Sequence, residues 1–188
     1  HRAMADRGAA AAVASELAAR PWQLVGREEE ARHVSELLSG PGARHVVLAG
    51  SAGVGKTRLA RELVEAAGQA GRPLLWTTAT RAARAVPLGA LLSIIPESRR
   101  DTGDRLQLFR EVVDGVGRLK VDEHPALVVI DDAHLLDDAS AALVLHLAVN
   151  GAASVLVTLR SGEPVPDPLV ALWKDGLAVR IDRACTSI

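Results

Sequence analysis

Eight consecutive residues have the types and the spacing needed to bind phosphate. Residues 50–57 read Gly-Ser-Ala-Gly-Val-Gly-Lys-Thr and fit the pattern G-x-x-x-x-G-K-[ST]. Glycines let the backbone curl so that successive N–H groups face phosphate oxygens, and the start of the next helix adds partial positive charge. Lys56 would reach the outer phosphates and act in catalysis, and the Thr57 hydroxyl would ligate Mg²⁺. The predicted phosphate-binding residues are Gly50, Ser51, Ala52, Gly53, Val54, Gly55, Lys56, Thr57 and Arg58.

The residues around this loop supply the strand and the helix that it requires. Residues 44–49 form a short apolar run typical of a buried strand, and apolar residues recur at helical spacing after Thr57. Of the 22 basic residues only Lys56, Lys120 and Lys174 are lysines. One of these three lysines, Lys56, occupies the position in the phosphate loop where a compact ammonium group is needed. The alternative interpretation is a glycine-rich turn without a ligand.

Two acidic residues follow a continuous apolar run of the chain. Residues 126–130 lack polar alternation, which indicates a central parallel strand buried on both faces, and Asp131 and Asp132 come directly after it. Asp131 would hold Mg²⁺ through water, and Asp132 would orient or deprotonate the attacking water as a catalytic residue. Both acids could instead only cap the next helix. His134 is more often a packing residue, and a catalytic role for it stays an alternative.

Thr158 and Arg160 stand at the end of another apolar run, residues 153–159. If that strand lies between the phosphate-loop strand and the strand before Asp131, both side chains would lie near the third phosphate of a nucleotide and could sense it. An exposed arginine without this role is the alternative.

The remaining pattern alternates strands and helices, which predicts a doubly wound α/β fold with a parallel sheet. We expect strands at 44–49, 74–78, 126–130, 153–159 and 177–181. We expect helices at 9–20, 28–38, after Thr57, and at 87–95, 106–119, 138–149 and 168–173.

Composition narrows the class of protein. The 188 residues have a net charge of −1, 2% aromatic residues and no tyrosine, which argues against a nucleic-acid-binding surface on this piece. Cys185 is the only cysteine, so disulfides and cysteine-rich zinc sites are excluded and a cytoplasmic location is expected. No apolar run is long enough for a membrane span. We expect a tag remnant and a helix in residues 1–23, one core in 24–183, and a vector-derived tail in 184–188.

Several motifs together resemble one known group. They are Leu24–Glu28, the phosphate loop, Val86–Leu92, Ile130–Asp137 and Val157–Arg160. In this combination the chain resembles the N-terminal nucleotide-binding domain of the large ATP-binding LuxR-type transcriptional regulators. These are signal-transducing ATPases with numerous domains, related to AAA+ proteins, and the resemblance covers residues 24–181.

The resemblance implies a P-loop NTPase fold with helices on both faces of a five-stranded sheet in the order 5-1-4-3-2. It implies that Val25, Gly26 and Arg27 lie against adenine and ribose, and that Arg160 is a sensor. It also implies a cycle in which ADP is bound at rest, ATP enters on a signal, and the protein self-associates. DNA would be bound by a C-terminal helix-turn-helix outside this chain, and hydrolysis would be a slow reset.

Two departures from that group change what we expect. The helical lid and the winged helix that follow the sheet in the group are absent here, so we expect a fragment with weakened nucleotide affinity. Asp132 stands where AAA+ motors have glutamate, so we expect slow turnover at most. The alternatives are an AAA+ machine of the origin-binding or clamp-loader kind, a small-molecule phosphotransferase, and a signalling ATPase without a DNA-binding tail.

Overall fold

The apolar runs of the sequence form one parallel sheet in the computed structural model, which describes residues 28–39, 45–95, 97 and 103–183. The strands are β1 (His45–Gly50), β2 (Leu74–Thr78), β3 (Ala126–Asp131), β4 (Ala153–Arg160) and β5 (Ala178–Arg183). The helices are α2 (Glu28–Ser39), α3 (Lys56–Gln69), α4 (Arg81–Arg84), α5 (Arg105–Gly117), α6 (Asp138–Val149) and α7 (Asp167–Lys174), with 3₁₀ turns η1 (Gly89–Leu91) and η3 (Ala133–Leu135).

The strand order is β2-β3-β4-β1-β5, and each neighbouring pair is parallel. This confirms the expected five-stranded sheet, since the order is 5-1-4-3-2 in reverse. β1 and β3 are buried at every position and β4 at every position except its last residue, as their lack of polar alternation predicts. β2 and β5 form the edges, and both contain partly or fully exposed residues among the buried ones.

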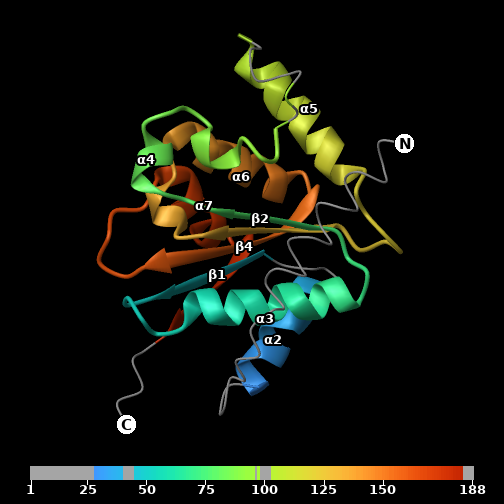
Figure 1. Ribbon diagram of the computed structural model, residues 1–188, viewed down its shortest axis with the longest axis vertical. Helices are drawn as coiled ribbons and strands as arrows, with labels where there is room; N and C mark the ends of the chain where they lie inside the picture. Colours follow the sequence, from blue (N-terminus) through green and yellow to red (C-terminus); the bar gives the residue numbers. More distant parts are fainter. Residues whose placement is uncertain (1–27, 40–44, 96, 98–102, 184–188) are drawn as a thin grey trace.

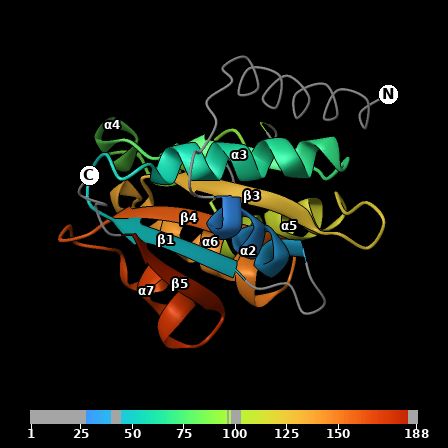
Figure 2. The same ribbon diagram turned by 90° about the horizontal axis from the view of Figure 1, so that it is seen from below.

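Helices cover both faces of the sheet, with α2 and α3 on one side and α5, α6 and α7 on the other (Figures 1 and 2). Successive residues of β1 divide between the two layers because side chains alternate along a strand. Val46 and Leu48 belong to the hydrophobic cluster under α2 and α3, whereas Val47 and Ala49 belong to the larger cluster under α5, α6 and α7.

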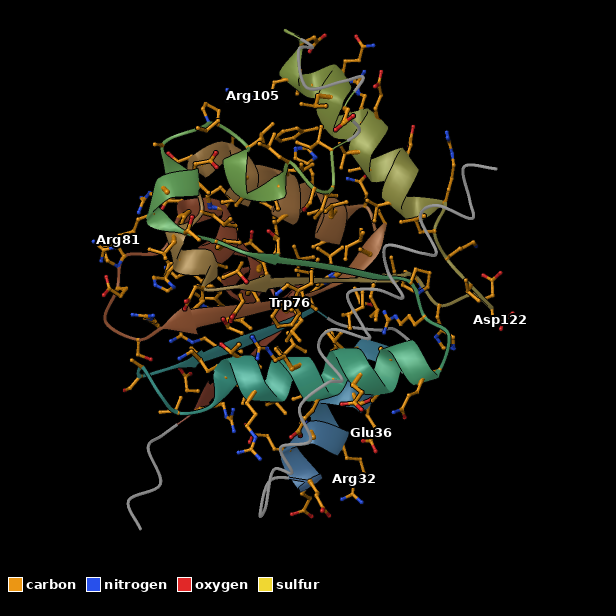
Figure 3. All side chains as sticks on the ribbon, viewed as in Figure 1. Arg32, Glu36, Trp76, Arg81, Arg105 and Asp122 are labelled. Atoms are coloured by element: carbon orange, nitrogen blue, oxygen red, sulfur yellow. The ribbon has the colours of Figure 1, made fainter. Side chains whose placement is uncertain are left out.

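The helices differ in how deeply they are buried. α6 is mostly apolar, with seven of its residues buried, and it packs against β4, α5 and α7. α3 has one apolar stripe, and Trp76 of β2 packs against the same cluster on this side of the sheet (Figure 3). Within the described residues, no helix is both long and apolar enough to cross a bilayer.

Three short elements differ from the sequence expectation. The helix expected at 87–95 is reduced to η1, because Leu88 has a left-handed backbone with φ 62° that interrupts helical geometry. α4 and η3 were not expected; α4 begins where the Thr80 hydroxyl accepts the Ala83 N–H. The helix expected at 9–20 and the segments 1–23 and 184–188 lie outside the described residues.

His45 begins β1 and is buried at the amino end of the sheet. Its Nδ1 accepts the Val155 N–H at 3.1 Å, which requires that this nitrogen carry no proton. Burial lowers the pKa of His45, and a backbone hydrogen bond involving Ala148 raises it by less. The folded chain therefore favours a neutral imidazole at this position.

The free energy of unfolding should fall as the pH is lowered below about 6.5, the ordinary histidine pKa. His45 has its lower pKa in the folded chain, so the unfolded chain takes up the proton first, and stability present above that pH is lost below it. The slope from one histidine is at most about 1.4 kcal/mol per pH unit. Urea unfolding at several pH values measures it. His45→Asn, whose Oδ1 can accept the same N–H, should flatten the curve; an unchanged curve would contradict this assignment.

Candidate functional site

The predicted phosphate loop connects β1 to α3 at the carboxyl edge of the sheet, seen at the left of Figure 1. Gly53 and Gly55 have φ of 79° and 83°, in the left-handed region that other residues rarely adopt. Gly55 is also the N-cap of α3, directly before its first residue Lys56, so the loop leads directly into a helix N-terminus. A Cβ on Gly53 would meet no heavy atom within 4 Å, so the left-handed backbone, and not crowding, is what favours glycine there.

The first glycine of the loop serves packing. Gly50 pairs with Arg183 across the β1–β5 boundary, and a Cβ on Gly50 would lie 2.6 Å from the Arg183 carbonyl oxygen. Contacts this short do not occur, so only glycine lets the edge strand approach the start of the loop.

Lys56 reaches back across the loop, with 6% of its surface exposed. Its ammonium donates to the carbonyl oxygens of Gly50 at 2.9 Å and Ser51 at 2.8 Å. Burial lowers the pKa of Lys56; Asp132 and Asp131 raise it, and Arg160 and Arg183 lower it. The sheet edge thus places this cation beside both acids.

Asp131 joins three elements of the fold. It ends β3, and its carboxylate accepts the hydroxyl of Thr57 from α3 at 2.9 and 3.0 Å and the hydroxyl of Thr158 from β4 at 2.6 Å. A carboxylate and a hydroxyl are the hard oxygen ligands that Mg²⁺ prefers, and nucleotide phosphates and water commonly complete its shell. Thr57 and Asp131 therefore fit the predicted metal. No cluster of three acidic, histidine or cysteine ligands occurs in the part of the chain described.

Asp132 adopts a left-handed backbone with φ 53°, and its N–H donates to the Thr158 hydroxyl at 2.8 Å. Its carboxylate lies 3.5 Å from Arg160 Nε and 4.0 Å from His134 Nδ1. Aspartate and asparagine tolerate this backbone region better than longer side chains. The conformation therefore gives a physical reason for aspartate at this position instead of the glutamate of AAA+ motors.

His134 lies beneath these acids, 3% exposed, and its Nδ1 has no hydrogen-bond partner among the described residues. Burial lowers the pKa of His134, and Asp132 raises it by less. The burial of the ring is in keeping with a packing residue.

The fold brings most of the predicted site residues together. Lys56, Thr57, Asp131, Asp132 and Thr158 are linked by the hydrogen bonds and charges above, and Arg160 reaches Asp132 with its side chain 45% exposed. Thr158 is fully buried and contacts both acids, so it orients them. The remaining predicted residues lie as follows: Ser51 and Ala52 are exposed on the loop, Val54 is buried beneath it, Arg58 pairs with Glu62 along α3, and Val25, Gly26 and Arg27 lie outside the described residues.

Arg183 contacts the site, although its sequence position gave no signal beyond the end of an expected strand. Its side chain, 3% exposed, donates from Nη1 to the Gly55 carbonyl at 2.7 Å and pairs with Glu30 of α2. β5 extends past the expected end at 181, and this extension brings Arg183 to the loop.

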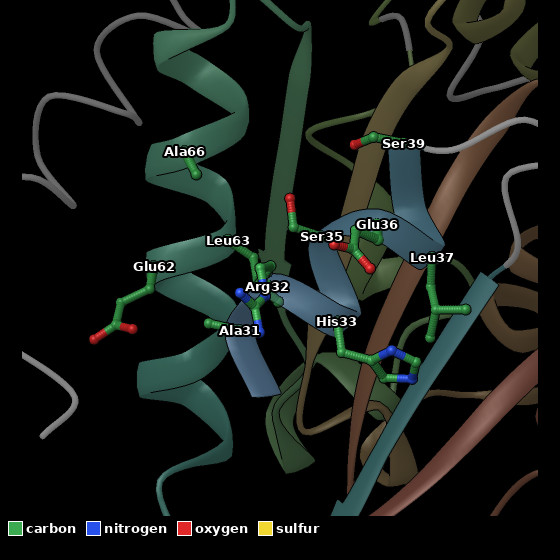
Figure 4. Close-up of a pocket in the computed structure, with 10 residues that line it drawn as sticks. All are labelled: Ala31, Arg32, His33, Ser35, Glu36, Leu37, Ser39, Glu62, Leu63 and Ala66. Atoms are coloured by element: carbon green, nitrogen blue, oxygen red, sulfur yellow. The ribbon is translucent and has the colours of Figure 1, made fainter. Parts of the chain in front are cut away.

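An open groove between α2 and α3 lies apart from this site (Figure 4). The residues that line it come from the two helices and include Ala31, Leu37 and Leu63 of the smaller hydrophobic cluster. None of its lining residues belongs to the phosphate loop.

A parallel sheet with a phosphate loop after β1 and paired acids after β3 defines a P-loop NTPase. The chain belongs to the AAA ATPase domain family, whose profile matches residues 23–158. Membership implies nucleotide binding, typically with Mg²⁺. A search of the curated proteins found no match to the chain.

Solved structures with the same fold include the ORC1 protein, DnaA and Hsp104. The Aeropyrum pernix ORC1 protein, solved in complex with DNA, is 21% identical with a TM-score of 0.60 and matches over 86% of this chain and 46% of its own. AMPPCP-bound DnaA from Aquifex aeolicus is 20% identical with a TM-score of 0.52 over 84% and 46%. Hsp104 from S. cerevisiae, in a complex with casein, is 20% identical with a TM-score of 0.52 over 86% and 27%. The chain thus spans less than half of each of these proteins.

Replacing Gly50 with alanine should destabilise the domain, because the added Cβ would collide with the Arg183 carbonyl. Overpacking of this kind costs about 1–3 kcal/mol. Gly115→Ala is the matched control, since Gly115 is exposed on α5 with no heavy atom within 4 Å of a new Cβ. It should gain up to about 1 kcal/mol from helix propensity. The unfolding midpoints of the two variants and the parent are measured by circular dichroism during heating. A Gly50→Ala midpoint equal to the parent's would contradict the close contact between Gly50 and Arg183.

Proposed function

We propose that this AAA ATPase domain binds ATP and ADP with Mg²⁺ and acts as a nucleotide-dependent switch within a multidomain transcriptional regulator. The observation that carries the nucleotide assignment is the single hydrogen-bonded group formed by Thr57, Asp131 and Thr158 beside Lys56. Lys56 and the loop N–H groups would hold the phosphates, and Thr57 with Asp131 would hold Mg²⁺, which neutralises phosphate charge when bound. The family and the AMPPCP-bound DnaA of the same fold support this assignment.

The second pair of residues supports a role in signalling. Asp132 would hold the attacking water, and Arg160, half exposed at 3.5 Å from Asp132, could exchange that contact for the third phosphate. A shared carboxylate lets the arginine respond to the phosphate present, which is what a sensor requires. The constrained backbone of Asp132 favours a short acid, which supports slow hydrolysis as a reset.

The proposed regulator would use parts of the protein beyond this chain. DNA contact would come from a C-terminal helix-turn-helix, and ATP would promote self-association of the full-length protein in the cytoplasm. These points rest on the motif resemblance. A full-length sequence without a helix-turn-helix would exclude the transcriptional assignment while leaving the nucleotide site intact.

An AAA+ machine with active hydrolysis is the second candidate. Its support is the fold shared with ORC1, DnaA and Hsp104. A machine of this kind needs turnover at ordinary enzyme rates, so the rate of hydrolysis separates the two candidates.

Lys56→Ala should weaken the binding of ATP and ADP measured by calorimetry, because the variant removes the cation that lies beside the loop carbonyls. We expect at least a tenfold loss, and GTP should bind more weakly than ATP to the parent. Lys174→Ala, an exposed lysine in α7, is the control and should bind as the parent does. Equal affinities of Lys56→Ala and the parent would overturn the nucleotide assignment.

Hydrolysis by the parent should be slow, with kcat below about 1 s⁻¹, the low end of ordinary enzyme rates. Asp132→Asn keeps a residue that tolerates the left-handed backbone but removes the carboxylate that would act as the base, so kcat at saturating ATP should fall by about a hundredfold. Asp138→Asn, an exposed acid in α6, should keep the parent rate. The rate of phosphate release from ATP measures kcat for the parent and for both variants. A parent kcat above that limit would favour the machine, and full activity in Asp132→Asn would exclude its role.

A further inference from the structure

The buried guanidinium of Arg183 contacts both the phosphate loop and α2. Its Nε lies 2.9 Å from Glu30 Oε1 and its Nη2 donates to Glu30 Oε2 at 3.1 Å, so the ion pair is bidentate. Its Nη1 donates to the Gly55 carbonyl at 2.7 Å. A buried charge needs such partners, and here they come from two separate elements of the fold.

Arg183 touches the two ends of the phosphate loop through different atoms. Its main chain pairs with Gly50 at the start of the loop, where a Cβ on Gly50 would lie 2.6 Å from the Arg183 oxygen. Its side chain reaches Gly55 at the end of the loop. One residue of the edge strand therefore contacts both the first residue of the loop, Gly50, and its last glycine, Gly55.

The bond to Gly55 also sets the direction of a donor inside the loop. In a trans peptide the C=O and the following N–H point in opposite directions. Arg183 and the Leu59 N–H both hold the Gly55 carbonyl, the latter at 3.0 Å, so the N–H of Lys56 is turned the other way. Backbone N–H groups at this point of the loop are the donors that bind phosphate.

We propose that Arg183 is a positioning residue, which, paired with Glu30, holds the phosphate loop in its anion-binding conformation. This inference rests on the nucleotide binding proposed above, and it names Arg183 as one cause of the nucleotide affinity. The Glu30 carboxylate neutralises the guanidinium, so Arg183 acts through the geometry of the loop. Arg183 is also among the charges that lower the pKa of Lys56, which agrees with its place beside the site.

A second buried arginine gives a matched comparison at the other end of α2. Arg72, 7% exposed, donates to the carbonyl oxygens of Leu38 at 3.0 Å and Pro125 at 2.7 Å, and also to the Ser154 hydroxyl. It fastens the last turn of α2 to the amino end of the sheet and has no contact with the phosphate loop in the described structure. Loss of Arg72 should therefore lower stability and leave nucleotide affinity unchanged.

The experiment measures nucleotide affinity and stability separately. Calorimetry gives the Kd for Mg-ATP and for ADP well below the unfolding midpoint, and circular dichroism gives the midpoint without nucleotide. The variants are Arg183→Met, Arg183→Lys, Arg183→Glu, the exchange Glu30→Arg with Arg183→Glu, and the control Arg72→Met. The exchange restores an ion pair across the same contact but leaves a carboxylate that cannot donate to the Gly55 carbonyl.

We expect Arg183→Met to bind both nucleotides at least tenfold more weakly, and Arg183→Lys to fall between it and the parent. The exchange should recover the midpoint lost in Arg183→Glu while its affinity stays low. Arg72→Met should lower the midpoint with affinity within twofold of the parent.

Recovery of affinity together with the midpoint in the exchange, or parent affinity in Arg183→Met, would overturn this inference alone. If the parent binds no nucleotide, or binds no better than Lys56→Ala, the proposed function falls and this inference falls with it.

Discussion

The hydrogen bonding of the Asp131 carboxylate is the interaction on which the arrangement of the site depends. A carboxylate 5% exposed at a sheet edge is costly to bury unless its oxygens are satisfied. The hydroxyls of Thr57 and Thr158 satisfy them, and each comes from a different element packed beside β3. The same Thr158 hydroxyl accepts the Asp132 N–H, so the position of the second acid follows from the first. A slip of one residue between β3 and β4 would turn Thr158 to the other face and break this group.

The two ends of the sheet have different roles: buried structural contacts lie at the amino end, and the candidate site lies at the carboxyl end. At the amino end, the buried side chains of His45, Arg72 and Ser154 form hydrogen bonds to the backbone or to one another. These bonds join β4 to β1 and join α2 to the sheet. At the carboxyl end lie the phosphate loop, the acids and Arg183. Ligands of open α/β sheets bind at the carboxyl ends of the strands, and the charges of this chain follow that rule. α2 connects both ends because an arginine holds it at each.

Much of the fold could be predicted because the main elements have strong local patterns. β1, β3 and β4 are mostly apolar runs, and α6 has the bounds expected from the sequence. The segment 87–95 was predicted wrongly as a helix because a left-handed Leu88 is held there by the bond from its N–H to Asp137, 49 residues away. Short elements such as η3 depend on contacts of this kind and leave no periodic signal.

The sequence by itself determined the chemistry of the site, because two short motifs, residues 50–57 and the paired acids Asp131 and Asp132, each consist of consecutive residues whose types suit phosphate and Mg²⁺. Tertiary structure alone decided which distant residues bond to the loop and to the acids. Thr158 lies 27 residues from Asp131, and Arg183 lies 128 residues from Gly55. Neither spacing carries a signal, because these hydrogen bonds arise only when the strand order places β4 beside β3 and β5 beside β1. The phosphate loop is therefore a local motif whose conformation depends on distant residues.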